Sequence, residues 1–145
     1  MNHGQKAREF FTKGYNCAQA TAAAFSDEAK IDVKTILKMM AGFGGGVAGQ
    51  REMCGAVTGM VFALSVIYGE YDALDNEAKT EMYRITREAI EEFRIEFGTT
   101  SCAELLEKAG CIAKENPTER TEDYYAKRPC TLFIEFAAEL AASHL

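Results

Sequence analysis

Apolar residues recur every three or four positions over a long stretch of this sequence, residues 75–97. The opposite face of the stretch carries charged side chains, so the spacing predicts one long amphipathic α-helix with a buried stripe. Gly98 follows the last apolar residue, which is the usual place for a glycine that ends a helix. The apolar stripe consists of Ala78, Met82, Ile85, Ala89, Phe93 and Phe97.

The rest of the chain also favours helices, because alternating apolar and polar runs are scarce and only two prolines occur. Asn16 with Gln19, and Ser101 with Glu104, form capping-box patterns at two helix starts. Residues 114–128 are polar and are expected to form a loop that can include a helical turn. The other expected helices are 4–13, 16–26, 32–41, 54–68, 101–108 and 129–142. We therefore predict an all-α, single-domain bundle of about five to seven helices over residues 1–145.

Composition limits the classes of partner. The 145 residues are 48% hydrophobic, as in a typical soluble domain, and 22 acidic against 16 basic side chains give a net charge of −6. This balance argues against nucleic-acid binding, which needs a basic surface. No apolar run is long enough to span a membrane, and the first residues lack a secretory signal. We expect a cytoplasmic protein, and a homodimer would be one way to cover the apolar helix at 54–68.

Glycines gather in a loop at residues 42–49, directly after the helix expected at 32–41. Gly44, Gly46 and Gly49 match the G-x-G-x-x-G pattern, but a dinucleotide site requires a preceding strand, and residues 35–40 have helical spacing. Two interpretations of the segment remain: a flexible connection with positive φ angles, or a loop whose bare backbone lets a ligand approach closely, just before Cys54. The candidate cofactor-binding residues are Gly44, Gly45, Gly46 and Gly55.

Five cysteines are the unusual part of the composition, since an odd number excludes complete disulfide pairing within one chain. Four of them fall in the first turn of an expected helix, where free N–H groups and the helix dipole lower a thiol pKa. Cys111 follows Gly110 and lies outside any such turn. The absence of a C-x-x-C motif weighs against a thioredoxin-type dithiol and a zinc ribbon. The four candidate redox and metal-binding residues are Cys17, Cys54, Cys102 and Cys130.

Several segments resemble the redox-active protein family C_GCAxxG_C_C, named for its cysteines and glycines. They are residues 14–20 (GYNCAQA), 42–46 (GFGGG) leading into 54–59 (CGAVTG), 101–106 (SCAELL), and Cys130 with the helix after it. This chain reads Cys54-Gly55 where the family's pattern has glycine before cysteine. The resemblance implies redox activity at Cys17, Cys54, Cys102 and Cys130, and leaves Cys111 without a role. A similar domain occurs in certain multihaem cytochromes, where an iron–sulfur centre has been suggested.

Three functions remain open from the sequence. The favoured one is a four-thiolate site, an iron–sulfur cluster for electron transfer with glycine-loop N–H groups on its sulfurs, or else zinc. The second is a metal-free dithiol–disulfide protein with Cys17 and Cys54 as the preferred pair. The third is a helical binding module with cysteines as apolar filler, in which Arg51 and Glu52 bind an anion or a partner. The residues do not indicate which protein would exchange electrons with this one, and they provide no well-placed catalytic base.

Overall fold

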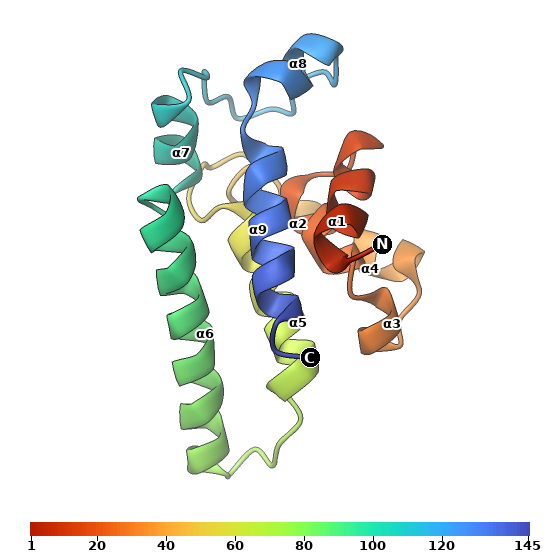
Figure 1. Cartoon of the computed structure of the whole chain (residues 1–145), viewed down its shortest axis with the longest axis vertical. Coiled ribbons are helices and arrows are strands. Elements are labelled where there is room, and N and C mark those ends of the chain that lie inside the picture. Colours follow the sequence, from red (N-terminus) through yellow and green to blue (C-terminus); the bar gives the residue numbers. More distant parts are fainter.

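The computed structural model describes residues 1–145 and is all-α, with nine α-helices and one short 3-10 helix (Figure 1). The prediction of an all-α fold is therefore confirmed. The helices are α1 (His3–Thr12), α2 (Cys17–Ala23), α3 (Ser26–Ala29), α4 (Val33–Met39), the 3-10 helix η1 (Ala41–Phe43), α5 (Gly55–Tyr68), α6 (Asn76–Phe97), α7 (Cys102–Lys108), α8 (Glu122–Lys127) and α9 (Cys130–Ala142).

Nine α-helices exceed the five to seven that the sequence predicts, because two short helices interrupt expected segments. The helix expected over 16–26 ends at Ala23, and α3 begins separately at Ser26, whose hydroxyl donates to the carbonyl oxygen of Ile31 at 2.6 Å. The polar segment 114–128 contains α8, which Thr121 caps by accepting a hydrogen bond from the Tyr124 N–H.

Helix α5 lies at the centre of the molecule, and α2, α6 and α9 pack against it (Figure 1). Its most deeply buried side chains, such as Met60 and Leu64, share one apolar core with Phe93 of α6 and Ile134 of α9. Helices of the same chain bury one side of α5, whereas side chains such as Phe62 and Ile67 remain partly exposed. A homodimer that covers these side chains stays a prediction. No helix of the chain has both the length and the apolarity that crossing a membrane requires.

Two glycines bring α5 unusually close to α2. A Cβ on Gly55 would lie 3.0 Å from the Cβ of Cys17, and a Cβ on Gly59 would lie 2.5 Å from the Cβ of Thr21. Side chains at these positions would hold the two helices apart. The Gly-Ala-x-x-Gly part of the motif therefore sets the first turn of α5, just after Cys54, directly against the first turn of α2, which holds Cys17.

Candidate functional site

One cavity of about 50 Å³ lies where the first turns of α2, α5, α7 and α9 converge, and four cysteines line it. The structure thus brings together the four cysteines that the sequence singles out: Cys17, Cys54, Cys102 and Cys130. Leu105, Leu106 and Phe133 form an apolar wall. The fifth cysteine lies elsewhere, with the Cys111 sulfur 3.4 Å from the carbonyl oxygen of Lys127.

Cys54 and Cys102 are held near each other by a short antiparallel pairing of two loops. Met53 and Ser101 form an isolated β-bridge, and the N–H of Cys54 donates to the carbonyl oxygen of Thr100 at 2.8 Å. The N–H of Cys102 donates back to the carbonyl oxygen of Glu52 at 2.5 Å. Backbone hydrogen bonds thus tie the start of α5 to the start of α7, although they are almost 50 residues apart in sequence.

The sequence predicts a capping box at the start of α2 and at the start of α7. The structure has both hydrogen bonds of the box at α2, but only one of them at α7. Asn16 and Gln19 form the expected capping box at α2, so this prediction is confirmed. Ser101 caps α7 by accepting from the Glu104 N–H at 3.3 Å, but the Glu104 carboxylate accepts from the Thr99 hydroxyl instead of reaching Ser101. The Thr99 hydroxyl takes the place of the Glu104 carboxylate in the box, because it accepts the hydrogen bond from the Ser101 N–H at 3.1 Å.

The glycine loop turns in the left-handed sense. Residues 45–49 and Arg51 all have positive φ angles, between 51° and 76°. Glycine adopts this conformation freely, but it costs other residues about 1–2 kcal/mol each, and Val47 is branched at Cβ. The positive φ angles expected for the glycines are confirmed for those within residues 45–49; that Val47, Ala48 and Arg51 share them is not predicted, because these residues rarely adopt positive φ. Such strain is typical of functional sites.

The loop presents backbone to the cavity, since Gly45 and Gly46 line it and their N–H groups donate no hydrogen bond within the protein. Gly55 also lines the cavity, whereas Gly44 lies outside its wall, where an added Cβ would be 2.6 Å from Nδ2 of Asn16. The loop follows α4 and η1, so the G-x-G-x-x-G match is not part of a βαβ unit, as predicted.

Two of the four thiols contradict the prediction of lowered pKa values at helix starts. Burial raises the pKa of Cys54 from 9.0 to about 12, although the N–H groups of Ala56 and Val57 act in the opposite direction. Hydrogen bonding with Cys130, and then burial, raise the pKa of Cys17 well above its ordinary value. Removal of a sulfur from water therefore outweighs the helix terminus at Cys54.

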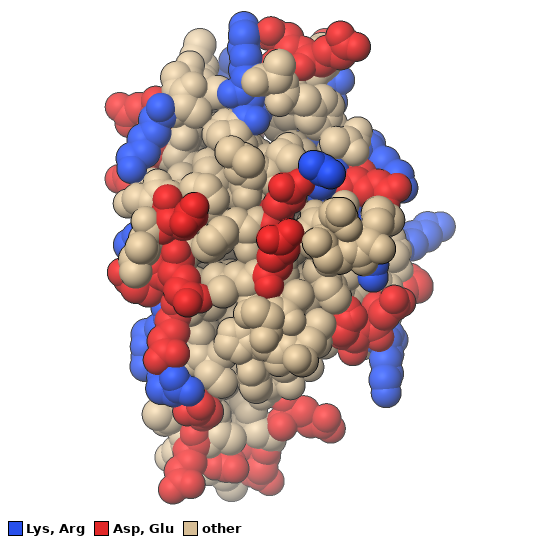
Figure 2. All heavy atoms as spheres, viewed as in Figure 1, with Lys and Arg blue, Asp and Glu red and all other residues tan.

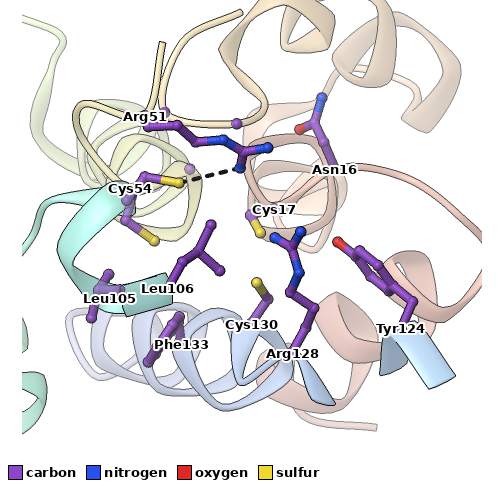
Figure 3. Close-up of a pocket in the computed structure, with 14 residues that line it drawn as sticks. Asn16, Cys17, Arg51, Cys54, Leu105, Leu106, Tyr124, Arg128, Cys130 and Phe133 are labelled. Atoms are coloured by element: carbon purple, nitrogen blue, oxygen red, sulfur yellow. Dashed lines mark hydrogen bonds between the residues drawn. The ribbon is translucent and has the colours of Figure 1, made fainter. Parts of the chain in front are cut away.

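Cys130 behaves in the opposite way, since its pKa is lowered despite the burial of its side chain. The largest cause is hydrogen bonding with Cys17, followed among the favourable causes by the positive charges of Arg128, Arg120 and Arg51. The sulfurs of Cys17 and Cys130 point toward each other, and the guanidinium group of Arg128 lies beside them (Figure 3). Within the cavity the Cys17 sulfur thus faces that of Cys130; Cys17 and Cys54 as the redox pair stays a prediction from the sequence.

Three arginines lie near the thiols; the sequence singles out Arg51 as a possible anion-binding residue, but not Arg120 or Arg128. Nη1 of Arg51 lies 3.5 Å from the Cys102 sulfur (dashed line in Figure 3). Arg128 and Arg120 both stack on the ring of Tyr124, at 5.1 Å and 4.7 Å from its centroid. Burial raises the pKa of Tyr124 to about 12, so its phenol stays neutral. The sequence offers one signal for Arg128, its position just before Pro129 and Cys130, and none for Arg120.

The four thiols do not fit a metal ion or an iron–sulfur cluster in this conformation. Such a site needs three or four ligands directed at one centre at short, regular distances. No group of three or more Cys, His, Asp or Glu side chains in the chain is arranged to hold a metal ion. The cavity walls thus supply thiols and arginine cations but no formed ligand set.

The fold and the cavity define a small all-α protein with thiols gathered at converging helix starts. A family model described as "Putative redox-active protein (C_GCAxxG_C_C)" matches residues 15–144, and the chain belongs to this family. The resemblance seen in the sequence is thereby confirmed, with redox activity as the family's described property. No curated protein and no solved structure matches the chain.

Proposed function

We propose that this protein is a metal-free dithiol–disulfide redox protein in which Cys130 is the attacking thiolate and Cys17 the second thiol. The observation that carries the proposal is geometric: the sulfurs of Cys17 and Cys130 face each other in the cavity, with the guanidinium group of Arg128 beside them (Figure 3). The lowered pKa of Cys130 and the raised pKa of Cys17 agree with this pairing. One thiolate with one protonated neighbour is the arrangement that thiol–disulfide exchange needs, because the thiolate attacks and the thiol later resolves.

The exchange proceeds in two steps. The Cys130 thiolate attacks one sulfur of a substrate disulfide, forming a mixed disulfide while the other substrate sulfur leaves as a thiolate. Cys17 then loses its proton and attacks the Cys130 sulfur, which closes a Cys17–Cys130 disulfide and releases the second substrate thiolate. The protein loses two electrons and one proton. The substrate disulfide gains the two electrons and, with that proton and a second one from water, becomes two thiols; the reverse sequence oxidises a dithiol.

Arginine charges support the reduced form. The positive charges of Arg128, Arg120 and Arg51 all lower the pKa of Cys130. Stabilisation of a thiolate favours the reduced state, which makes the disulfide a stronger oxidant. Cys54 stays protonated at neutral pH, because burial holds its pKa near 12. Cys54 therefore contributes an apolar, unreactive wall to the site in this proposal.

Equilibration in buffers of reduced and oxidised dithiothreitol, followed by intact mass, tests the proposal. We expect a loss of two hydrogen atoms per molecule in one cooperative two-electron step. Cys17→Ser and Cys130→Ser should each abolish this step, whereas Cys111→Ser should preserve it, because the Cys111 sulfur faces Lys127 and not the cavity. Persistence of the two-electron step in Cys130→Ser would refute the proposal.

A four-thiolate metal site is the second candidate, favoured by the single observation that Cys17, Cys54, Cys102 and Cys130 line one cavity. It requires the sulfurs to move from their present positions, since they form no ligand set. Elemental analysis and a visible spectrum of protein purified without oxygen separate the candidates. Stoichiometric iron or zinc that is lost on substitution of any one of the four cysteines would replace the dithiol proposal; absence of bound metal supports it.

A further inference from the structure

A second, larger cavity adjoins the thiol cavity. It measures about 300 Å³ and lies between the glycine loop and residues 115–118. The two cavities share five lining residues, so the larger one adjoins the thiol cavity: Asn16, Gly45, Arg51, Tyr124 and Arg128. Its volume is at the lower end of the range for small-molecule sites and suits a compact molecule of modest length.

The shared wall carries two arginines without acidic partners. Elsewhere Arg8, Arg84 and Arg94 each form a salt bridge with a glutamate. Arg51 and Arg128 instead donate to neutral groups: Nε of Arg51 to the carbonyl oxygen of Lys114 at 2.8 Å, and Nη2 of Arg128 to that of Ile112 at 3.4 Å. Neither arginine forms a salt bridge with a carboxylate of the chain, although the chain has six more acidic than basic groups.

Other groups of the cavity add to its positive character. The N–H groups of Gly44 and Gly45 donate no hydrogen bond within the protein, and both residues line the larger cavity. Nearby backbone N–H groups of this kind favour a negative ligand. Glu115 is the one acidic residue in the lining, and its side chain is exposed. Two planar guanidinium groups offer the geometry that a carboxylate binds best.

From these features we infer that the larger cavity binds the carboxylate of a small anionic disulfide, or of its thiol, and so selects the substrate of the Cys17–Cys130 dithiol. The inference rests on the proposed function and names its substrate class. Arg51 and Arg128 bind the carboxylate while the disulfide bond reaches the Cys130 sulfur. The bound disulfide is reduced to two thiols as the two cysteines join, with the electron balance given above.

The charge preference is distinctive because it reverses that of a bare thiolate. An unassisted thiolate repels a carboxylate and attracts an ammonium group, so it reacts faster with a cationic disulfide than with an anionic one. Three small disulfides of similar length provide the comparison: dithiodipropionate is anionic, hydroxyethyl disulfide is neutral and cystamine is cationic. Rate constants for oxidation of the reduced full-length protein are measured by intact mass at neutral pH and low salt.

We expect dithiodipropionate to react about tenfold faster than hydroxyethyl disulfide, and cystamine to react slowest. The ratio of the anionic to the neutral rate is the readout, because a change in Cys130 thiolate content alters both rates equally. Arg128→Gln should bring this ratio close to one, and so should Arg51→Asn, which tolerates the positive φ. Arg87→Gln, at an exposed arginine of α6 that forms no salt bridge, is the matched control and should leave the ratio unchanged.

A binding measurement separates failure of this inference from failure of the proposed function. Suberate has the same chain length as dithiodipropionate but no sulfur, so calorimetry with the Cys17→Ser/Cys130→Ser protein reports the cavity without redox chemistry. We expect suberate to bind, the neutral diol of equal length to bind about tenfold more weakly, and Arg128→Gln to remove the difference. Equal binding of the two compounds, or a wild-type rate ratio of one or less, overturns the inference. If suberate binds as expected but the wild-type protein shows no two-electron step, the dithiol proposal is rejected and the carboxylate site is kept.

Discussion

The thiols of this chain differ in what surrounds each sulfur, although four of them start or precede a helix. Cys54 is 4% exposed and Cys130 is 8% exposed, yet their pKa values shift in opposite directions. The difference comes from the neighbours of each sulfur. A thiol partner and three arginine charges lower the pKa of Cys130, whereas burial is the main influence on the pKa of Cys54 and raises it. A helix start alone therefore does not predict which cysteine is a thiolate.

Alkylation by iodoacetamide across a pH series, followed by peptide mass spectrometry, tests whether Cys130 ionises at lower pH than Cys54. We expect the reactivity of Cys130 to rise at lower pH than those of Cys17 and Cys54, because its pKa is lowered, while Cys54 stays unreactive until about pH 12. The midpoint of the profile is the readout, since burial slows the absolute rate. Arg128→Gln should move the Cys130 midpoint to higher pH, and Arg87→Gln should not. A Cys54 midpoint below that of Cys130 would contradict the order.

The raised pKa of Cys54 predicts that the folded protein becomes less stable at alkaline pH. Its thiol stays protonated in the folded protein up to about pH 12, whereas in the unfolded chain it ionises near its ordinary pKa of 9.0. The unfolded state therefore gains stability as the pH rises above about 9, by up to about 1.4 kcal/mol for each pH unit until the folded pKa is reached.

Comparison of the wild type with Cys54→Ala isolates this effect, because alanine cannot ionise. The variant should be less stable near neutrality, owing to the lost sulfur, but the gap should narrow by about 1 kcal/mol between about pH 8 and about pH 10. Urea unfolding at the two pH values measures it. A gap that stays constant would show that the Cys54 thiol ionises equally in both states.

At the scale of elements, the α2–α5 crossing places Cys17 and Cys54 at the same cavity, and two glycines make it possible. Gly59→Ala would place a Cβ 2.5 Å from the Cβ of Thr21, so we expect a loss of about 1–3 kcal/mol in the free energy of unfolding. Gly42→Ala is the matched control, because nothing lies within 4 Å of its added Cβ. Urea unfolding of both variants provides the comparison. Equal stability of the two would show that α2 and α5 do not need this close approach.

Helix periodicity predicts the long elements well, since α1, α5, α6 and α9 begin and end within about two residues of their expected positions. Short elements are harder, because the four-residue α3 and the six-residue α8 carry too few apolar positions to show a period. This matters for the site: α8 and the residue after it bring Tyr124 and Arg128 to the thiol cavity. Four site cysteines and Arg51 could thus be identified from the sequence, whereas Tyr124 and Arg128 could not.

At the scale of the whole molecule, charge is distributed unevenly. The face shown in Figure 2 carries a column of acidic side chains along α6, where Glu81, Glu88 and Glu91 pair with arginines of the same helix. The unpaired Arg51 and Arg128 lie instead at the thiol cavity. Net charge alone would not have predicted an electropositive site, because it sums groups that the fold separates. Which cysteines face each other likewise depends on tertiary contacts between α2 and α9.

A Cys17–Cys130 disulfide would join the first and last helices of the cavity and close a loop of more than about 100 residues. Loop closure alone predicts that oxidation raises the free energy of unfolding by up to about 4–5 kcal/mol. The Cys130 thiolate stabilises the reduced protein, so the measured difference should be smaller than this value. Urea unfolding of oxidised and reduced protein measures the difference. The Cys130→Ser protein should show none, and a wild type equally stable in both states would argue against a bond across so long a loop.

Disulfide mapping of the mildly oxidised protein tests the central claim most directly. The reduced protein is oxidised with hydroxyethyl disulfide at neutral pH, free thiols are blocked, and peptides are identified by mass spectrometry without reduction. The account predicts one dominant cross-link, between the peptides that contain Cys17 and Cys130, with Cys54, Cys102 and Cys111 recovered as blocked thiols. A dominant Cys17–Cys54 or Cys54–Cys102 cross-link, or no intramolecular cross-link at all, would contradict it.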